Sequence, residues 1–571
     1  MKNIFFVLSI SMTCFIGCKN NVKTDVKEEI QIETEVSETI KLWEPYNDSA
    51  EVAANMDHEK ERMRYKLIQS KVLDKNEVFS PLFKEVSKMS ETAYKNLIPL
   101  IIEQDIPTIQ QHISSGALSY EELVLFYLYR IYRYELNNET TLNTIIALNK
   151  NVVDEARALD ALNEGSKSLK QHPIYGMPVL LKDNINTTGI VTTAGSIALR
   201  KNEVDDAFIV QRLKKQGALI LGKVNLSEWA YFMCSGCPVG YSAVGGQTLN
   251  PYGRRIFETG GSSSGSGTAM AANYAVAAVG TETSGSILSP SSQNSVVGLK
   301  PTIGLLSRSG IVPISSTLDT PGPMTRNVID NGILLDAMRG FDEADDASVQ
   351  ADWDKEWYLA TKNYSGLKGK RLGVFKNLME SDSIYKSTVM ELENAGAVIF
   401  QFTAPEVNMD GFISILNIDM KNDLPKYLDK YVKNKEVTIT DISSLIAFNN
   451  RDSLTRIPYG HALFTGIMAD STNTEQLITI KSRLEKNGRT FFNDAMNKHQ
   501  LDAILSINNY HAGYAAVAKY PALTIPMGYK TSGEPISLTF IGKQYQEAKL
   551  LHLGKAFEDA FPLRKTPGGY D

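Results

Sequence analysis

Two short segments rich in serine and glycine contain the residues that could do chemistry. The first is Thr259–Gly267 (TGGSSSGSG) and the second is Thr281–Ser286 (TETSGS). A serine hydroxyl can attack a carbonyl carbon when a base removes its proton, and the backbone N–H groups of a glycine-containing loop can stabilise the resulting oxyanion. These residue types therefore indicate nucleophilic catalysis.

The first segment is compatible with other roles. A phosphate-binding loop of the Walker type ends in Gly-Lys-Ser or Gly-Lys-Thr, and this segment has no lysine. It also lacks the Gly-x-Gly-x-x-Gly pattern of dinucleotide-binding turns. Gly261–Gly265 does match the Gly-x-Ser-x-Gly elbow of esterases, which would make Ser263 the nucleophile. This esterase alternative and a plain flexible linker both remain open at this point.

The elements between the two segments predict that the segments lie together. Residues 264–273 suit a helix of about 15 Å, and residues 275–280 suit a strand of about 16 Å. A strand that runs back antiparallel to the helix returns the chain to the level where the helix began. We therefore expect Ser286 beside Ser262, although 24 positions separate them.

A lysine closes the apolar run Pro178–Leu181. Lysines mostly lie on solvated faces, so a lysine at the end of a buried strand is unusual. Burial would lower the pKa of Lys182, and a neutral lysine beside the two serine segments is a candidate general base.

The rest of the chain predicts an α/β domain with a largely buried sheet. Ser119 and Glu122 form a capping box that opens a helix over 121–134. Residues 43–104 predict a helical N-terminal extension, and residues 410–497 predict a helical insertion that acts as a lid or shapes the substrate site. Apolar runs that suit strands alternate with helical patterns. These runs are 178–181, 218–222, 275–279, 503–507, 523–526 and 537–541.

Length and composition exclude some classes of protein. The 571 residues are 43% hydrophobic, which can build a substantial core and argues against a disordered chain. The net charge of −6 argues against a nucleic-acid-binding protein, which usually carries a basic face. No internal stretch reaches the roughly 20 apolar residues that a membrane-spanning helix needs.

The N-terminus predicts export. Residues 1–18 contain a charged start and an apolar run, and they are typical of a signal peptide of the lipoprotein type with Cys18 as the lipidated residue. A plain signal peptide cleaved nearby is the alternative. Residues 19–42 are polar and suit a tether. The chain is therefore expected in the bacterial cell envelope, anchored to a membrane on its periplasmic or surface side.

Cys234 and Cys237 are the two cysteines outside the targeting segment. A zinc site needs about four ligands, and no second cysteine pair exists. No βαβ pattern around them supports a thioredoxin-like motif. In an oxidising compartment the pair could form a local disulfide, or the two could be small loop residues.

Taken in order, these segments resemble the amidase signature family. GGSSSGSG, TETSGS and VGLKPT carry the resemblance, together with LLKDNINTTG, GKVNLSE, DTPGP, YPALTIPMG and ISLTFIG. It spans about residues 105–567, and we expect an amidase domain over 105–571. In motif detail the chain is most similar to bacterial peptide amidases. The resemblance implies a large mixed β-sheet core covered on both faces by helices.

The resemblance also implies a mechanism. Ser286 would attack the carbonyl of a linear carboxamide such as a C-terminal peptide amide, releasing ammonia or an amine through an acyl-enzyme. Ser262, expected after a cis peptide bond, would pass the proton to Lys182, and Ser263 would support the site. Small-molecule or peptide amides are the expected partners, with no nucleic acid, cofactor or metal. The expected oxyanion hole consists of the backbone N–H groups of Thr283, Ser284, Gly285 and Ser286.

Two positions depart from the family pattern. Leu288 stands where many members have an arginine, so the acidic residue Glu282 loses a partner. Ser284 stands where many members have glycine, which is tolerable only if that position needs no positive φ.

Three alternatives follow from these departures and from the motifs. One is an esterase that uses Ser263, and another is a non-catalytic, ligand-binding surface lipoprotein. A tRNA-amidotransferase subunit is disfavoured by the export signal. The histidines available to the esterase are His461, His499, His511 and His552.

Overall fold

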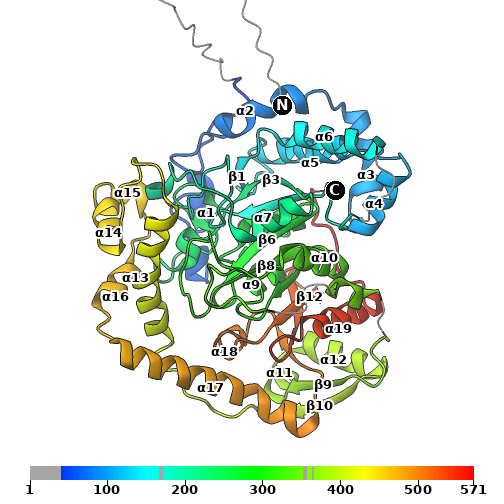
Figure 1. Ribbon diagram of the computed structural model, residues 1–571, viewed down its shortest axis with the longest axis vertical. Helices are drawn as coiled ribbons and strands as arrows, with labels where there is room; N and C mark the ends of the chain where they lie inside the picture. The colour runs from blue at the N-terminus through cyan, green and yellow to red at the C-terminus, as the bar shows by residue number, and fades with distance from the viewer. Residues whose placement is uncertain (1–39, 166–170, 351–355, 363–364, 571) are drawn as a thin grey trace, which may run out of the picture. The chain divides into compact units, whose positions relative to one another are not determined.

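The computed structural model describes residues 40–165, 171–350, 356–362 and 365–570 (Figure 1). The predicted signal peptide, Cys18 and nearly all of the predicted tether lie outside these residues, so they stay predictions. From Ile40 onward the chain forms one compact unit.

Eleven strands of the described chain form one sheet. β3, β2 and β6 run parallel to one another, as do β11, β9 and β10, whereas the other neighbours are antiparallel. In sheet order the strands are β1 (Ile145–Leu148), β3 (Leu219–Val224), β2 (Pro178–Lys182), β6 (Ala277–Glu282), β8 (Thr320–Thr325), β7 (Val297–Lys300), β12 (Ala522–Tyr529), β13 (Pro535–Ile541), β11 (Ala503–Ile507), β9 (Arg371–Phe375) and β10 (Val398–Phe402). A separate ribbon pairs β4 (Tyr241–Ser242) with β5 (Gly246–Gln247).

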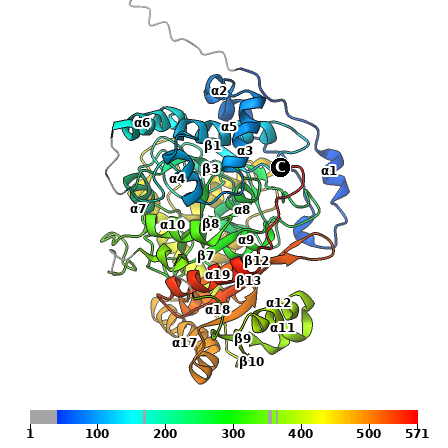
Figure 2. The same cartoon turned by 90° about the vertical axis from the view of Figure 1, so that its right-hand side faces the viewer.

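Helices cover both faces of this sheet. α8 packs on β2, β3 and β6, and α9 packs on β7, β12 and β13, whereas α10 and α19 pack together against β8, β7 and β12. Figure 2 shows α7 and α10 on one side of β7 and β8, with α8 and α9 on the other side. The helices that cover the sheet are α7 (Phe208–Lys215), α8 (Ser264–Ala271), α9 (Leu288–Gln293), α10 (Val328–Met338), α12 (Ser383–Asn394), α18 (Ala512–Ala518) and α19 (Glu547–Ala560). The predicted α/β class, with a large mixed sheet between helices, is confirmed.

The remaining helices belong to two stretches of the chain, 49–165 and 376–499. The N-terminal ones are α1 (Ser49–Ala54), α2 (Lys75–Val86), α3 (Glu91–Ile101), α4 (Ile106–Ser114), α5 (Tyr120–Glu135) and α6 (Val152–Gly165). Those of the later part are α11 (Lys376–Ser381), α13 (Phe412–Tyr431), α14 (Ile442–Asn450), α15 (Ser453–Arg456), α16 (Ala462–Ala469) and α17 (Thr474–His499). Short 3₁₀ turns are η1 (Glu61–Met63), η2 (Ile197–Leu199), η3 (Glu228–Tyr231) and η4 (Trp357–Thr361).

The boundaries of one predicted strand are corrected. β6 begins at Ala277 rather than at Ala275, because the guanidinium of Arg326 donates to the carbonyls of Ala275 and Val276 at 2.7 and 3.3 Å. The strand then continues to Glu282, so it carries the chain directly into the second serine segment. The capping box of α5 forms as predicted.

The N-terminal extension is helical only in part. Its apolar spacing predicts helix already before residue 75, yet α2 begins at Lys75, where the Asp74 side chain accepts a hydrogen bond from the Asn76 N–H. The preceding residues run over the ribbon: Ile68 accepts from the Gln247 N–H at 2.8 Å. Long-range pairing of these backbone groups outweighs the local helical pattern there.

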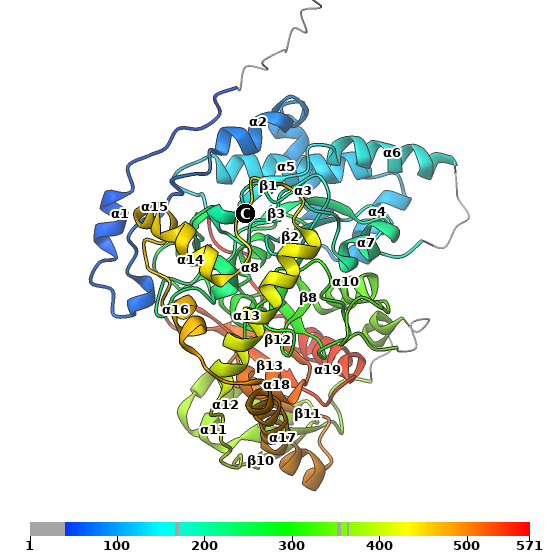
Figure 3. The same ribbon diagram turned by 60° about the vertical axis from the view of Figure 1, so that its left-hand side comes forward.

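The predicted insertion contains α13, α14, α15, α16 and α17. In Figure 3, α13 crosses the front of the molecule, with α14, α15 and α16 at the left and α17 at the bottom. The buried residues of the insertion form a second hydrophobic core with the loops around Trp229 and Leu318. Cys234 and Cys237 belong to this core and are joined by a disulfide, which settles the alternatives that the sequence left open for them. No described helix is long and apolar enough to cross a membrane.

Candidate active site

Three elements deliver the predicted catalytic residues to one edge of the sheet. β2 and β6 are parallel neighbours, with Leu181 beside Val279, so their carboxyl ends meet. Lys182 is the last residue of β2, and the segment that ends in Ser286 follows β6. The loop before α8 comes to the same place, because the Ser263 N–H donates to the Ser286 carbonyl at 3.1 Å. The structure thus brings the two serine segments and the lysine together.

Lys182 and Ser262 are in direct contact and fully buried. Lys182 Nζ lies 2.8 Å from Ser262 Oγ, and neither side chain is exposed to solvent. The peptide bond between Gly261 and Ser262 is cis, as the resemblance led us to expect. Burial lowers the pKa of Lys182 from 10.5 to about 7, although Asp319 and Glu282 oppose this shift. A substantial fraction of the lysine is therefore neutral near pH 7.

The surroundings of Lys182 suit a neutral amine, which has two N–H groups and one lone pair. Nζ can donate to the carbonyl of Thr281 at 3.1 Å and to its hydroxyl at 2.8 Å. The lone pair is then left for the hydroxyl of Ser262. Asn184 also donates to the Thr281 hydroxyl, at 3.0 Å, and fixes its position. Sequence analysis assigned no role to Thr281 or Asn184, although both lie inside the quoted motifs TETSGS and LLKDNINTTG.

The loop after β6 presents four backbone N–H groups. Within the described residues, none of the N–H groups of residues 283–286 donates to another protein atom. Gly285 adopts a φ of +84°, whereas Ser284 is not among the residues with positive φ. The departure at Ser284 is therefore accommodated, because the left-handed residue of this turn is the glycine. Ser286 is half-buried, so a substrate can reach it from the surface.

The acidic residue of this loop is held by the backbone. The Glu282 carboxylate accepts from the N–H groups of Ile287 and Leu288 at 2.7 and 3.0 Å. Leu288 thus contributes its N–H where many family members also offer an arginine side chain. Lys300, fully buried, is the nearby cation: burial lowers its pKa to about 8, against the opposing influence of Glu282 and Glu547.

Asp319 holds the other side of the same loop. Its carboxylate accepts from the Thr283 hydroxyl at 2.5 Å and from the N–H groups of Ile314 and Ser315 at 2.8 and 2.9 Å. Burial raises the pKa of Asp319 to about 6, so it is mostly ionised at pH 7. The sequence quoted this aspartate within DTPGP, but a link to Thr283, 36 positions away, has no local signal.

Ser263 is in an environment that differs from that of an esterase nucleophile. Its hydroxyl is fully buried, donates to the Thr281 carbonyl at 3.0 Å and accepts from the Thr281 N–H at 3.2 Å. The histidines have other neighbours: His511 contacts Ser506, His552 contacts Ser365, His499 stacks on Phe400 and His461 lies against Phe464. The elbow motif therefore does not form a serine–histidine pair at Ser263 in the described structure.

Among the residues that the structure describes, no group of three or more His, Cys, Asp or Glu side chains could hold a metal ion.

Comparison with known proteins identifies the family. The family model for amidases matches residues 122–508. The chain is 36% identical to the probable amidase of Arabidopsis thaliana, over 82% of this chain and 92% of that protein. Two solved structures are similar in fold and sequence. An amidase family protein from Bacillus anthracis is 36% identical, with a TM-score of 0.82 over 88% of this chain and 99% of the other.

The second structure is the peptide amidase from Stenotrophomonas maltophilia, 35% identical, with a TM-score of 0.75 over 82% of this chain and 98% of the other. The residues that the family model matches include both serine segments and Lys182. The chain therefore belongs to the amidase family, and it is a hydrolase that acts on amide carbon–nitrogen bonds other than peptide bonds.

Proposed function

We propose that this amidase hydrolyses the C-terminal amide of peptides to a carboxylate and ammonia, with Ser286 as nucleophile, Ser262 as proton relay and Lys182 as base. The observation that carries the proposal is the buried contact between Lys182 Nζ and Ser262 Oγ, 2.8 Å long, beside the loop of Ser286. A lysine with a pKa of about 7 can remove a proton at neutral pH.

In the first half of the reaction, Ser286 Oγ attacks the amide carbon. Its proton passes to Ser262, whose own proton passes to the lone pair of Lys182. The carbonyl oxygen becomes an oxyanion and accepts hydrogen bonds from the free N–H groups of residues 283–286. When the C–N bond breaks, Lys182 returns a proton through Ser262 to the leaving nitrogen, which departs as ammonia.

In the second half, water hydrolyses the ester on Ser286. The neutral Lys182 takes the proton of the attacking water through Ser262, and the same N–H groups stabilise the second oxyanion. The ester bond to Ser286 breaks, the serine regains its proton, and the carboxylate product leaves. Ser263 supports the relay by fixing Thr281, which in turn holds Lys182.

The peptide-amide substrate rests on the likeness to the peptide amidase. The test is ammonia release from N-acetyl-alanine amide and from short peptide amides by the purified body of the protein, from about residue 20. We expect turnover by the wild type and none by Ser286→Ala. Absence of ammonia release from every amide tested would contradict the proposed substrate.

We also propose that the protein is exported and lipidated at Cys18. The support is the apolar run Ile4–Gly17, which ends directly at this cysteine. Metabolic labelling with a tritiated fatty acid should mark the wild type in bacterial cells and leave Cys18→Ser unlabelled. Equal labelling of both proteins would refute the assignment.

A further inference from the structure

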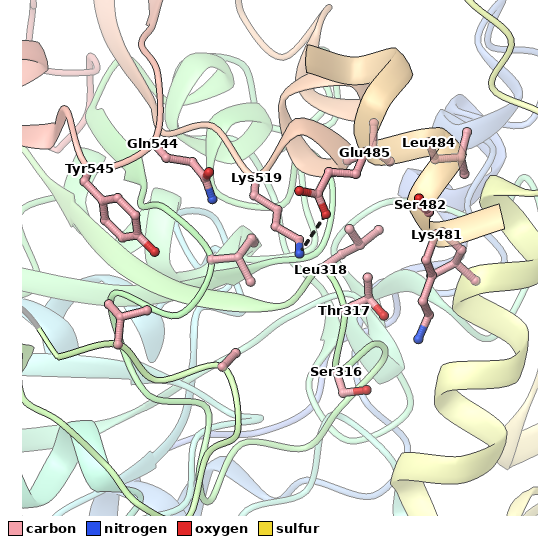
Figure 4. A pocket seen from close by; sticks show the side chains of 15 residues that line it. Ser316, Thr317, Leu318, Lys481, Ser482, Leu484, Glu485, Lys519, Gln544 and Tyr545 are labelled. Carbon is pink, nitrogen blue, oxygen red and sulfur yellow. Dashed lines mark ion pairs between the residues drawn. The ribbon is translucent and has the colours of Figure 1, made fainter. Parts of the chain in front are cut away.

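A cavity of about 430 Å³ lies beside the turn that leads to Asp319 (Figure 4). Its walls come from the turn 316–318, the insertion helices α13 and α17, the end of α18, the loop 544–545 and the loop residues Ile303, Ala347 and Val349. This volume is in the range of sites that bind small molecules.

The lining combines an apolar floor with a charged rim. The apolar lining, which we call the floor, consists of Ile303, Leu318, Ala347, Val349, Ile415, Leu484 and Val517. At the rim, Lys519 pairs with Glu485 at 2.9 Å, the contact drawn as a dashed line in Figure 4, and Lys481 pairs with Asp419 at 2.6 Å. Serine and threonine hydroxyls lie between them. The charged groups are already paired, but a purely aliphatic chain would cover the hydroxyls without bonding to them, whereas a peptide offers both an apolar side chain and N–H and C=O groups.

Lys519 occupies a position where glycine is usual. It follows α18 with a φ of +59°, and its N–H bonds to the Ala516 carbonyl while the Tyr520 N–H bonds to the Ala515 carbonyl. This is a Schellman motif, whose left-handed residue is most often glycine because a side chain strains that conformation. The ammonium group of Lys519 lies at the rim of the cavity.

α18 connects the cavity to the oxyanion-hole loop. A Cβ added to Gly285 would lie 3.6 Å from Cβ of Ala512, and one added to Gly513 would lie 3.8 Å from Oγ of Ser284. From Gly513 to Lys519 the chain advances six residues, which is about 9 Å along a helix. An extended peptide covers about 3.3 Å per residue, so about three substrate residues span this distance.

The turn before Asp319 is a second connection between the cavity and the oxyanion-hole loop. Asp419 on α13 accepts from the Ser315 hydroxyl at 2.5 Å and binds Lys481 of α17 through its other oxygen. Asp319, at the end of the same turn, holds Thr283. One turn thus joins the insertion, the cavity and the oxyanion-hole loop, and Leu318 within it forms part of the cavity floor.

We propose that this cavity binds the acyl part of a peptide amide, with an apolar side chain of the third residue from the scissile amide on the floor and the peptide backbone at the Lys519–Glu485 rim. This inference rests on the proposed function, since it states where the peptide amide of that function binds. It predicts that the enzyme prefers peptide amides of three residues over single-residue amides and over fatty-acyl amides of the same reach.

The test compares three substrates: N-acetyl-alanine amide, N-acetyl-Leu-Ala-Ala amide and octanoyl-alanine amide. The wild type should show a kcat/KM at least tenfold higher for the tripeptide amide than for either of the others. Equal values for the tripeptide and single-residue amides would overturn the extended site. A higher value for the octanoyl compound would overturn the peptidic class.

Two cavity variants and one control test whether the preference for the tripeptide amide arises in this cavity. Ser482 is exposed on α17 at the cavity wall, so Ser482→Trp should reduce the ratio of tripeptide to single-residue kcat/KM at least tenfold. The matched control is Ser387→Trp, an exposed serine in the middle of α12, which should leave the ratio unchanged. Lys519→Gly places the preferred residue in the Schellman motif, so the melting temperature should stay equal or rise while the ratio falls at least fivefold. An unchanged ratio in either cavity variant would contradict the proposal.

Binding measurements separate this inference from the proposed function. With Ser286→Ala, calorimetry should detect N-acetyl-Leu-Ala-Ala amide, and the double variant Ser286→Ala, Ser482→Trp should bind it at least tenfold more weakly. If no amide is hydrolysed by the wild type, the proposed function fails but this binding difference is still measurable. If both proteins bind the tripeptide amide equally, or neither binds it, the cavity assignment is wrong whatever the catalytic result.

Discussion

Raising the pH from 5.5 to 8.5 should activate the Lys182 base. Burial lowers the pKa of this lysine to about 7, and the neutral amine is the form that accepts a proton. With that pKa, about 3% of Lys182 is neutral at pH 5.5 and about 97% at pH 8.5. We therefore expect kcat/KM to rise about thirtyfold over this range, with a slope of about tenfold per unit below pH 7 and a plateau above about pH 8.

The position of the plateau reports the environment of the lysine. A lysine in water has a pKa near 10.4, so only about one molecule in 2,500 would be neutral at pH 7. The difference corresponds to about 5 kcal/mol, which the fold supplies by keeping the charged form of Lys182 away from water. A solvated base would instead give a rate that still increases at pH 9.

The assay is ammonia release from one amide substrate at constant ionic strength, analysed as kcat/KM against pH. Lys182→Arg should show no activity anywhere in the range, because a guanidinium stays protonated. His511→Asn is the control, because a histidine near the loop could also titrate. Burial lowers the pKa of His511 to about 4, so the rising part of the pH profile, its limb, should stay near pH 7 in this variant. A flat profile, a limb near pH 10, or an active Lys182→Arg enzyme would refute the reasoning.

Three substitutions test the parts around the base. Ser262→Ala should lower kcat about a thousandfold or more by interrupting proton transfer, as steady-state kinetics would measure; unchanged kinetics would move the relay to another serine such as Ser263. Gly285→Ala should lower kcat about tenfold or more, since alanine is strained at a φ of +84° by about 1–2 kcal/mol, and full activity would show that the loop conformation is dispensable. Asp319→Asn removes a negative charge that raises the pKa of the base, so the limb of the pH profile should move to lower pH, and a move to higher pH would contradict the electrostatic account.

The contact between Lys182 and Ser262 agrees with the expectation from the sequence, because each residue lies in a local motif. Helix and strand lengths predicted that the two serine segments meet, and the resemblance to the amidase signature family paired Ser262 with Lys182. The partners that tune this contact were not predictable in the same way. Thr281 bonds to Lys182 across 99 positions and Asp319 bonds to Thr283 across 36, and neither pairing has a periodic or compositional signal.

Long-range contacts also explain where the predicted elements were wrong. The apolar spacing before Lys75 is helical, but the backbone there pairs with the ribbon at Gln247 instead. The cavity shows the same limit, because Leu318, Glu485 and Lys519 come from three separate segments that only the folded chain brings together. Sequence patterns therefore predicted the sheet and the serine segments better than the insertion's relation to them.

The most direct test of the central claim is covalent labelling of the serine nucleophile. The purified body of the protein would be treated with a fluorophosphonate, digested, and the adduct located by mass spectrometry. We expect one adduct on Ser286 in the wild type, none in Ser286→Ala, and slow labelling in Lys182→Ala. An adduct on Ser263, or complete absence of an adduct from a protein that hydrolyses amides, would contradict the assignment of Ser286 as nucleophile.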